Sequence, residues 1–222
     1  RSLPLEAVTG TTSPEETERL RAEGRSKHLE RATELYRIAV DSDLMREFDN
    51  DSVELYSADA GLLTDSPDKL VEDISGENQI LVREVADVCR AAESEIIVIS
   101  PYFVPGNDGV AFWKEQVDRG VRVVVITNGL ASNNHTAVHS GYARYRKKLI
   151  RAGVELREAR ANAVDKPELG KAGTQDLTLH TKAMLFDRRR LFVGSLNLDP
   201  RSIAINSEMG LLVDSDEMGG RL

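Results

Sequence analysis

The sequence predicts an α/β fold, a β-sheet flanked by helices, with a charged and mainly helical segment in front of it. From about residue 76, apolar residues at helical spacing alternate with short β-branched runs, and glycines follow several of the helical segments. Residues 1–75 are instead highly charged and mostly helical in pattern. We therefore expect two parts, a helical segment at 1–75 and an α/β domain at 76–222.

The first part carries a clear helix start. In the stretch 13–40, Ser13 stands at the N-cap position, Pro14 at the first helical position and Glu16 at the capping-box spacing. Apolar residues are sparse there, which favours a helix that lies on another surface over one that forms a core. Asp, Ser and Pro residues at 64–70 mark the boundary to the second part.

The second part is predicted to alternate helices with buried strands. In chain order the predicted elements are helix 77–92, strand 95–100, helix 110–120, strand 121–127, helix 139–153 and strand 154–158. Gly120 and Gly153 end the second and third of these helices. Residues 159–176 have the composition of an exposed loop, and its length favours a functional or mobile segment.

Length and composition limit the classes of protein. With 222 residues, 41% of them hydrophobic, the chain is long enough for one globular domain with a sizeable core. No apolar run approaches the roughly 18 residues of a membrane span, and no signal peptide is visible. The single Cys89 excludes an internal disulfide and a cysteine-based metal cluster, so we expect it to be a small buried side chain. Because the chain begins at Arg1 and stops at "DEMGGRL", we expect a fragment of a longer protein.

The segment "LTLHTKAMLFD" (177–187) is predicted to be a strand with an unusual polar face. The period of two places His180, Lys182 and Met184 on one side of it. For a lone histidine, a solvated strand at a sheet edge would be the usual interpretation. A charged pair in a strand whose neighbours are buried favours a binding or catalytic site instead.

The residues after this strand add polar groups to the same region. The run 191–193 is predicted to complete a hairpin and to end at Gly194, whose backbone freedom allows a turn. Ser195 and Asn197 then supply small polar groups beside the histidine and lysine.

A further carboxylate follows. Asp199 and Pro200 signal the start of a helical turn, and Glu208 stands at the start of another apolar strand. From there its carboxylate could accept the proton on one imidazole nitrogen of His180 and fix the tautomer.

This set of groups suits phosphodiester transfer without a metal. An imidazole can attack phosphorus or protonate the leaving oxygen, and a lysine with an asparagine amide can bind the non-bridging oxygens. No cluster of Asp, His or Cys at metal-ligand spacing is visible elsewhere, so we expect no metal and no cofactor, and Lys182 supplies the cation.

The pattern H-x-K-x₄-D, followed after six residues by G-S-x-N, resembles the signature of the phospholipase D superfamily. Its fixed positions are occupied by His180, Lys182, Asp187, Gly194, Ser195 and Asn197. "SPYFVP" (100–105) and residues 137–158 also resemble the second half of bacterial cardiolipin synthases, and the charged stretch that ends in "DSPDK" resembles the connector between their halves. The resemblance implies a phospholipase D-like mixed β-sheet flanked by helices, in the C-terminal half of such a protein.

The resemblance also implies roles for individual residues. His180 would be one of two catalytic histidines, acting as nucleophile or as general acid. Lys182 and Asn197 would bind phosphate, and Ser195 would help to line that phosphate site.

Two carboxylates complete the implied set. Glu208 would orient His180. Asp187 belongs to the catalytic motif, but we expect it to hold the local structure rather than to touch substrate.

One departure from the family pattern matters for function. The family builds each active site from two motifs, and this chain has one. The other nearby histidines, His135 and His139, lack a lysine two residues further on, where Ala137 and Gly141 stand. We therefore expect His139 to be a cap or surface group.

A stripe of basic residues at i, i+3, i+4 and i+7 runs along the helix 139–153. Its members are Arg144, Lys147, Lys148 and Arg151. It can be a contact for anionic lipid headgroups or simply a solvated helix face.

Three functions remain open. The leading hypothesis is half of a cardiolipin synthase-type phosphatidyltransferase that forms a phosphohistidine. Its partners would be a phospholipid substrate, the missing first-motif half and, for the parent protein, the bacterial inner membrane, with the fragment itself soluble. A second hypothesis is a phosphodiesterase or nuclease in which a second copy of the chain completes the site. The net charge of −8 argues against nucleic acid as its substrate. The third is an inert isolated half.

Overall fold

The computed structural model describes residues 13–19, 21–22, 43–50, 52–53, 55–70, 79–132, 136–160 and 178–221. The chain divides into two compact units, Arg1–Leu55 and Tyr56–Leu222. In the first unit, the Ser13 hydroxyl accepts a hydrogen bond from the Glu16 N–H at 3.1 Å, which confirms the predicted helix start. Residues 20 and 23–40 of the predicted helix lie outside the described residues, and α2 (Asp43–Asp49) follows them.

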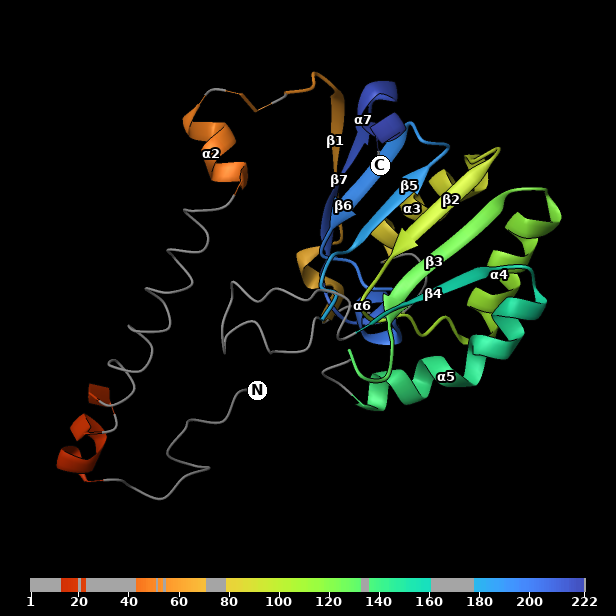
Figure 1. Cartoon of the computed structure of the whole chain (residues 1–222). Coiled ribbons are helices and arrows are strands. Elements are labelled where there is room, and N and C mark those ends of the chain that lie inside the picture. The colour runs from red at the N-terminus through yellow and green to blue at the C-terminus, as the bar shows by residue number, and fades with distance from the viewer. Residues whose placement is uncertain are drawn as a thin grey trace. The chain divides into compact units, whose positions relative to one another are not determined.

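The second unit is built on a seven-stranded sheet with the order β1-β7-β6-β5-β2-β3-β4 (Figure 1). The strands are β1 (Asp59–Thr64), β2 (Glu95–Ile99), β3 (Arg122–Asn128), β4 (Glu155–Ala159), β5 (Ala183–Phe186), β6 (Arg190–Gly194) and β7 (Met209–Asp214). β2, β3 and β4 are parallel, and the other neighbours pair antiparallel. The sheet is therefore mixed, as the resemblance to the phospholipase D superfamily implied.

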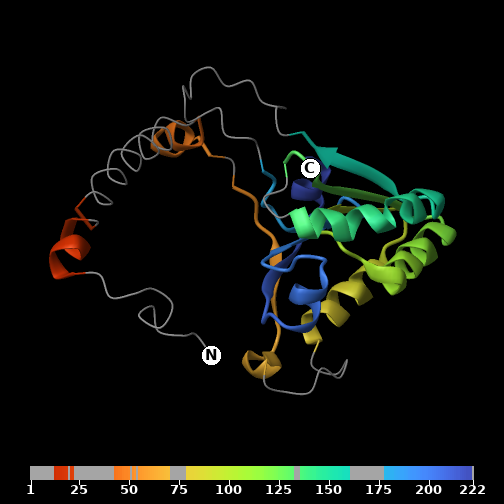
Figure 2. The ribbon, with the colours of Figure 1, turned by 90° about the horizontal axis from the view of Figure 1, so that it is seen from below.

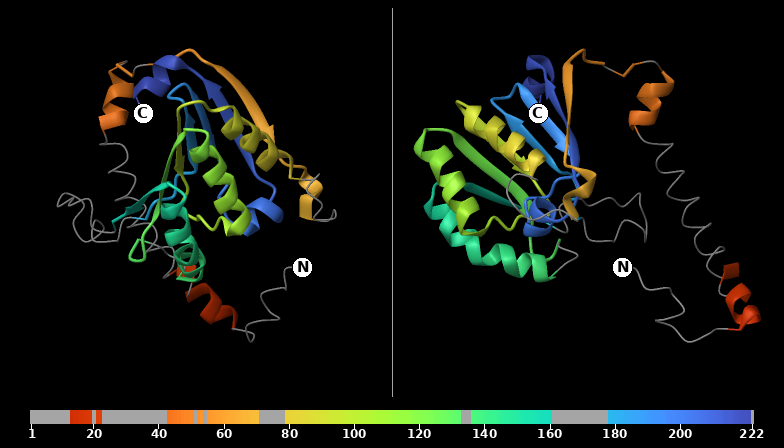
Figure 3. Two further views of the ribbon diagram at one scale, coloured as in Figure 1. Left: turned by 90° about the vertical axis from the view of Figure 1, so that its right-hand side faces the viewer. Right: turned by 180° about the vertical axis from the view of Figure 1, so that it is seen from behind.

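Helices α3, α4 and α5 cover one face of this sheet (Figures 2 and 3). The helices and the short 3-10 turn η2 span η2 (Pro67–Leu70), α3 (Ile80–Ala91), α4 (Gly106–Asp118), α5 (Thr136–Arg151), α6 (Pro200–Ala204) and α7 (Asp216–Arg221). The core lies between the helices and the sheet, where Leu81 and Cys89 of α3 pack in one cluster with Ile96 and Val98 of β2. The predicted burial of Cys89 is confirmed, and burial raises the pKa of its thiol to about 12.

Most predicted elements lie within a few residues of the observed ones. The helix predicted at 110–120 begins earlier, at Gly106, and α5 begins at Thr136 rather than at residue 139. Gly120 and Gly153 both have positive φ angles, of 90° and 89°, which explains why these helices end at glycines. The loop predicted at 159–176 overlaps β4 at residue 159, and residues 161–177 lie outside the described residues.

The sheet extends upstream of the boundary expected at residue 76. β1 pairs antiparallel with β7 in the register Asp59–Asp214 to Thr64–Met209, within the segment that the sequence pattern suggested was helical. Of its six residues only Leu63 is half-buried, and the others are exposed. An edge strand so little buried lacks the apolar alternation by which strands are recognised in sequence.

The strand expected at 177–187 is shorter than predicted. Regular strand structure begins at Ala183, whose partner on β2 is Ile99, the last residue of that strand. Residues 178–182 have no regular secondary structure, because β2 offers them no further partner.

Gly194 was expected to allow a turn, but it is not one of the described glycines with a positive φ angle. It ends β6 opposite Gly210, where an added Cβ would collide with the Met209 carbonyl oxygen of β7. The close approach of two strands, rather than a turn, therefore requires glycine here.

Candidate active site

His180 and Lys182 lie together at the end of the sheet where β2 and β3 finish and β5 begins. Lys182 Nζ is 3.3 Å from Nε2 and 3.5 Å from Nδ1 of the His180 ring, and it donates a hydrogen bond to the His180 carbonyl at 2.8 Å. The His180 side chain is exposed, whereas Lys182 is half-buried. Burial lowers the pKa of Lys182 from its ordinary value, and the negative charge of Glu208 opposes that shift. The structure thus brings the predicted imidazole and ammonium together on an open surface.

Asn128, the last residue of β3, holds the backbone next to His180. Its Oδ1 accepts a hydrogen bond from the Leu179 N–H at 2.9 Å, and its Nδ2 donates to the Leu179 carbonyl at 3.0 Å. The side-chain amide therefore pairs with this irregular segment much as a neighbouring strand would. Asn128 is 1% exposed and Leu179 is half-buried, so water reaches these bonds only from the Leu179 side. The sequence analysis missed this residue, and its one signal was an asparagine at the end of an otherwise apolar strand.

Asp187 lies at the opposite end of β5 from His180, in the turn to β6. Its carboxylate accepts hydrogen bonds from the N–H groups of Glu93, Ser94 and Glu95 at 2.7–3.0 Å and from the Ser94 hydroxyl at 2.8 Å. Burial alone would raise the pKa of Asp187, but these donors outweigh burial and hold the pKa below its ordinary value. Asp187 and Arg188 both adopt left-handed backbone angles, with φ of 51° and 52°. The motif aspartate therefore fixes a turn and does not contact His180.

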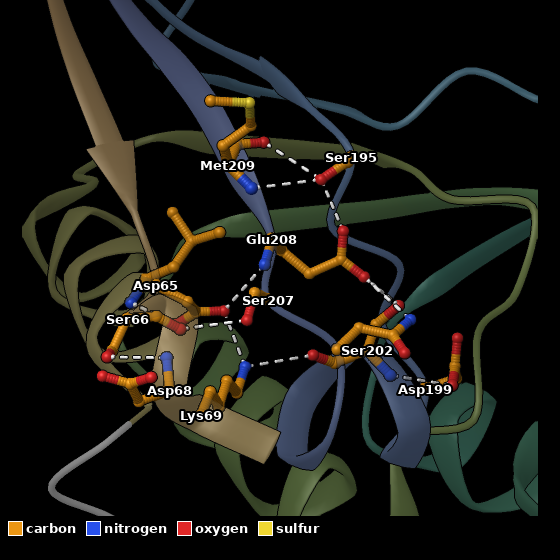
Figure 4. A network of polar contacts seen from close by, with 12 residues as sticks. Asp65, Ser66, Asp68, Lys69, Ser195, Asp199, Ser202, Ser207, Glu208 and Met209 are labelled. Atoms are coloured by element: carbon orange, nitrogen blue, oxygen red, sulfur yellow. Dashed lines mark hydrogen bonds and ion pairs between the residues drawn. The ribbon is translucent and has the colours of Figure 1, made fainter. Parts of the chain in front are cut away.

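Glu208 is the centre of a buried polar network directly before β7 (Figure 4). Its carboxylate accepts hydrogen bonds from the Ser195 hydroxyl, from the Ser202 hydroxyl at 2.8 Å and from Asn206 Nδ2 at 3.2 Å. None of its hydrogen bonds among the described residues goes to His180. Glu208 thus orients Ser195 in this structure, in place of the contact with His180 that the sequence analysis expected.

Ser195 is tied into this network on both sides. Its hydroxyl donates to Glu208, and its Oγ accepts a hydrogen bond from the Met209 N–H at 3.1 Å. Because a hydroxyl carries a single proton, Ser195 has none left to donate to a bound phosphate. The predicted phosphate role of Ser195 therefore cannot include donation of a hydrogen bond in this arrangement.

Asn197 differs from Ser195 in having a polar atom without a partner. Its Oδ1 is buried and makes no hydrogen bond to any described residue. Buried polar atoms are almost always paired in folded proteins, so a ligand that meets Oδ1 has to donate a hydrogen bond to it. The unpaired atom is an acceptor, so an anionic oxygen could be met only by the Nδ2 group of the same side chain.

His139 lies on the first turn of α5. It is buried, and its ring packs edge-on against Tyr142, with ring centroids 5.8 Å apart. The expectation of a cap or surface group is wrong, because His139 packs within the domain. His135 lies outside the described residues.

The basic stripe of α5 is fully on the surface. Arg144, Lys147, Lys148 and Arg151 are all exposed, while Leu149 on the opposite side of the helix is buried. Lys148 donates to Asn107 Oδ1 at 2.8 Å. The side chains of Arg144, Lys147 and Arg151 lie on the exposed face of the helix.

The structure shows neither a metal cluster nor a membrane span within the part of the chain that it describes. No group of three or more His, Cys, Asp or Glu side chains is placed there to hold a metal ion. No described helix is long and apolar enough to cross a bilayer.

Comparison with known proteins gives consistent results at the sequence level. The model of a family described as "Cardiolipin synthase, PLD-like domain" matches residues 85–221. Cardiolipin synthase C of Escherichia coli K12 is 34% identical over 97% of this chain. The chain spans 46% of the length of that relative.

Solved structures share the fold at much lower identity. Nuc, a phospholipase D family member from Salmonella typhimurium, has a TM-score of 0.50 at 16% identity, and the alignment covers 74% of this chain and 88% of Nuc. Phosphatidylserine synthase from Haemophilus influenzae Rd KW20 has a TM-score of 0.53 at 16% identity, covering 75% of this chain and 37% of that protein. These structures confirm the predicted fold class.

Proposed function

Since the chain belongs to the family of phospholipase D-like domains of cardiolipin synthases, we propose that it is one half of a phosphatidyltransferase that works through a phosphohistidine and without a metal. The observation that carries this proposal is the His180–Lys182 pair, an exposed imidazole with an ammonium 3.3 Å from its Nε2. The substrate is a phospholipid, and the acceptor is an alcohol such as the glycerol of a second lipid.

The chemistry proceeds in two displacements. Lys182 and the Asn197 amide hold the non-bridging oxygens of the phosphodiester and stabilise the negative charge that develops on them. One imidazole nitrogen attacks phosphorus, the bond from phosphorus to the leaving alcohol oxygen breaks, and a second imidazole gives that oxygen its proton. The acceptor alcohol then loses its proton to the second imidazole and displaces the first, which restores both histidines.

His180 supplies one of the two imidazoles. A single histidine cannot attack phosphorus and protonate the leaving oxygen in the same step, so the second must come from elsewhere. The chain spans less than half of its E. coli relative, which leaves room for a first-motif half in the parent protein. The isolated chain is therefore expected to be inactive, and the parent is expected to act at a membrane surface.

Cardiolipin formation by the full-length protein tests this proposal. His180→Ala should abolish transfer, and His28→Ala, in the charged N-terminal part, serves as the control. Brief incubation with a phospholipid labelled in its phosphate should leave acid-labile label on the wild-type protein. Transfer by His180→Ala at the wild-type rate would exclude the assignment.

A homodimeric phosphodiesterase is the second candidate, because the sequence has a single H-x-K-x₄-D motif and a second copy could complete the site. The mass of the isolated chain in solution and its turnover of a chromogenic phosphodiester decide between the two. A dimer with diesterase activity favours this candidate, and a monomer without activity favours the half-enzyme.

A further inference from the structure

A buried ion pair lies beneath the Glu208 network, in the segment between β1 and the end of η2 (Figure 4). Lys69 Nζ is 2.6 Å from Asp65 Oδ2, and the side chains are 1% and 0% exposed. Both residues precede the family match, which begins at residue 85. They also lie in the stretch that the sequence pattern assigned to a helical connector.

The pair contacts the backbone on which the Glu208 network is built. Asp65 Oδ2 accepts a hydrogen bond from the Glu208 N–H at 3.2 Å, and the Asp65 N–H donates to the Glu208 carbonyl at 2.9 Å. Lys69 Nζ donates to the Ser202 carbonyl at 3.3 Å. The Ser202 hydroxyl in turn donates a hydrogen bond to the Glu208 carboxylate. The Asp65–Lys69 pair therefore holds the backbone of both residues that form this bond.

The pair also links this network to the core. Asp65 Oδ1 accepts a hydrogen bond from the Leu81 N–H at 3.1 Å, near the start of α3. Asp65 therefore joins η2, α3 and the start of β7 through one carboxylate. This arrangement fixes the Glu208 backbone against two other elements of the fold.

Stability alone is a poor explanation for such a pair. Removing two charges from water costs about as much as their mutual attraction returns, so a hydrophobic pair of similar size is often equally stable. What a buried, fully bonded pair provides is a defined position for the groups that it contacts. Here those groups are the backbones of Glu208 and Ser202. The Glu208 side chain in turn accepts the hydrogen bond from the Ser195 hydroxyl.

We propose that Asp65 and Lys69 are positioning residues that fix Glu208, and through it Ser195, at the catalytic end of the sheet. The positional part stands on the contacts alone, and its catalytic consequence rests on the proposed function. Residues upstream of the catalytic motif are in this way part of the working half-site.

Hydrogen exchange on this chain tests the positional part without any activity. Lys69→Met and Asp65→Asn are compared with Lys114→Met, which removes the cation of the exposed Lys114–Asp118 pair at the same i,i+4 spacing. In both pair variants, the amides of Glu208 and Met209 should exchange at least about tenfold faster than in the wild type, while amides of β3 keep their protection. Lys114→Met should leave all of these rates unchanged.

The combination Asp65→Asn with Lys69→Met provides a rescue test. It removes both charges, so neither an unpaired carboxylate nor an unpaired ammonium remains buried. The single amide oxygen at position 65 can accept from the Glu208 N–H, and the Leu81 N–H then loses its acceptor. Protection at Glu208 should return to within about threefold of wild type. If Lys69→Met alone fails to fold, Asp65→Asn and the double variant decide the question. Unchanged Glu208 exchange in Asp65→Asn, or a uniform loss across the sheet, would overturn the proposal.

Turnover by the full-length enzyme tests the catalytic consequence. Lys69→Met should lower kcat about 10- to 100-fold with KM nearly unchanged, because a shift of the Ser195 backbone would displace the reacting groups beside it. In a Glu208→Gln background the same change should lower kcat less than about threefold, because the two act through one path. Losses that multiply in the double variant would show that Lys69 acts independently of Glu208. An inactive parent enzyme would refute the proposed function and leave the exchange result to decide the positioning.

Discussion

Replacing Asn128 tests how the backbone next to His180 is held. The Asn128 amide is 1% exposed and pairs with both the N–H and the carbonyl of Leu179, at 2.9 and 3.0 Å. Asn128→Ala removes both bonds and leaves two backbone groups without their partner. An unpaired buried group costs about 1–3 kcal/mol, and because Leu179 is only half-buried, water recovers part of that cost. We expect a loss of about 2–3 kcal/mol in the free energy of unfolding.

The same substitution should reduce catalysis more than its effect on stability implies. Leu179 directly precedes His180, so freeing its backbone lets the imidazole drift from the line of attack. A misplacement of about 1 Å costs about 10²-fold in rate. Asn128→Asp separates the two bonds, since it keeps the acceptor for the Leu179 N–H but sets a carboxylate oxygen against the Leu179 carbonyl. It should also be destabilised, by about 1–3 kcal/mol.

Urea unfolding of this chain and turnover of the full-length enzyme measure the two effects. Asn107→Ala is the matched control, because Asn107 is an exposed asparagine whose side chain accepts one hydrogen bond, from Lys148. It should change the unfolding free energy by less than about 0.5 kcal/mol and leave kcat unchanged. If Asn128→Ala matched Asn107→Ala in both assays, the view that Asn128 replaces a strand partner would be refuted.

Other predictions concern charge. The pKa of Asp187 is depressed, so its contribution to stability is present above the ordinary carboxyl pKa and is lost as the pH falls through the pKa of the folded state. In a plot of unfolding free energy from urea titrations against pH, Asp187→Asn should therefore reduce the slope on the acid side. An unchanged slope would count against the role of Asp187 in the turn. The pKa of Lys182 is lowered, so phosphate binding should weaken as the pH rises through that lowered value, and Lys182→Arg should remove this alkaline loss in a binding titration while Lys147→Arg keeps it. Changing Arg144, Lys147 and Arg151 to Gln should lower the affinity for anionic vesicles, measured by co-sedimentation, about fivefold per charge. The control changes Arg83→Gln and Lys114→Gln should leave this affinity unchanged. Equal losses in both sets would indicate a nonspecific effect of charge.

The elements that the sequence predicted well are those with strong local patterns. α3 places Leu81, Val85 and Cys89 on one buried face, and helical periodicity alone predicts that face. Asp199 caps α6 through hydrogen bonds from the N–H groups of Arg201 and Ser202, as the Asp-Pro signal predicted. Local chemistry suffices in such cases.

The parts that were missed depend on contacts between residues distant in the chain. Glu208 stands 28 positions after His180 in the sequence. The alternation of apolar residues in the strand that follows it cannot show that its carboxylate contacts Ser195 rather than the His180 imidazole. Asn128 meets Leu179 across 51 positions, and Asp65 meets Glu208 across 143. Such pairs are set by strand order and register, which propensity and periodicity do not determine.

The commitment of Ser195 to Glu208 limits what this half-site can do for a phosphate. Under the proposed function, the motif side chains left to donate to the non-bridging oxygens are the Lys182 ammonium and the Nδ2 group of Asn197, because the Ser195 proton is already used. A phosphodiester in transfer carries its developing charge on two non-bridging oxygens. Each of them can accept more than one hydrogen bond, so one ammonium with one amide leaves part of this capacity unfilled. Under the proposed function, we therefore expect the partner half to bring donors as well as an imidazole. If so, the isolated chain lacks donors for phosphate binding as well as a second histidine for acid–base chemistry. It should then bind phosphodiesters weakly, in addition to being limited in turnover.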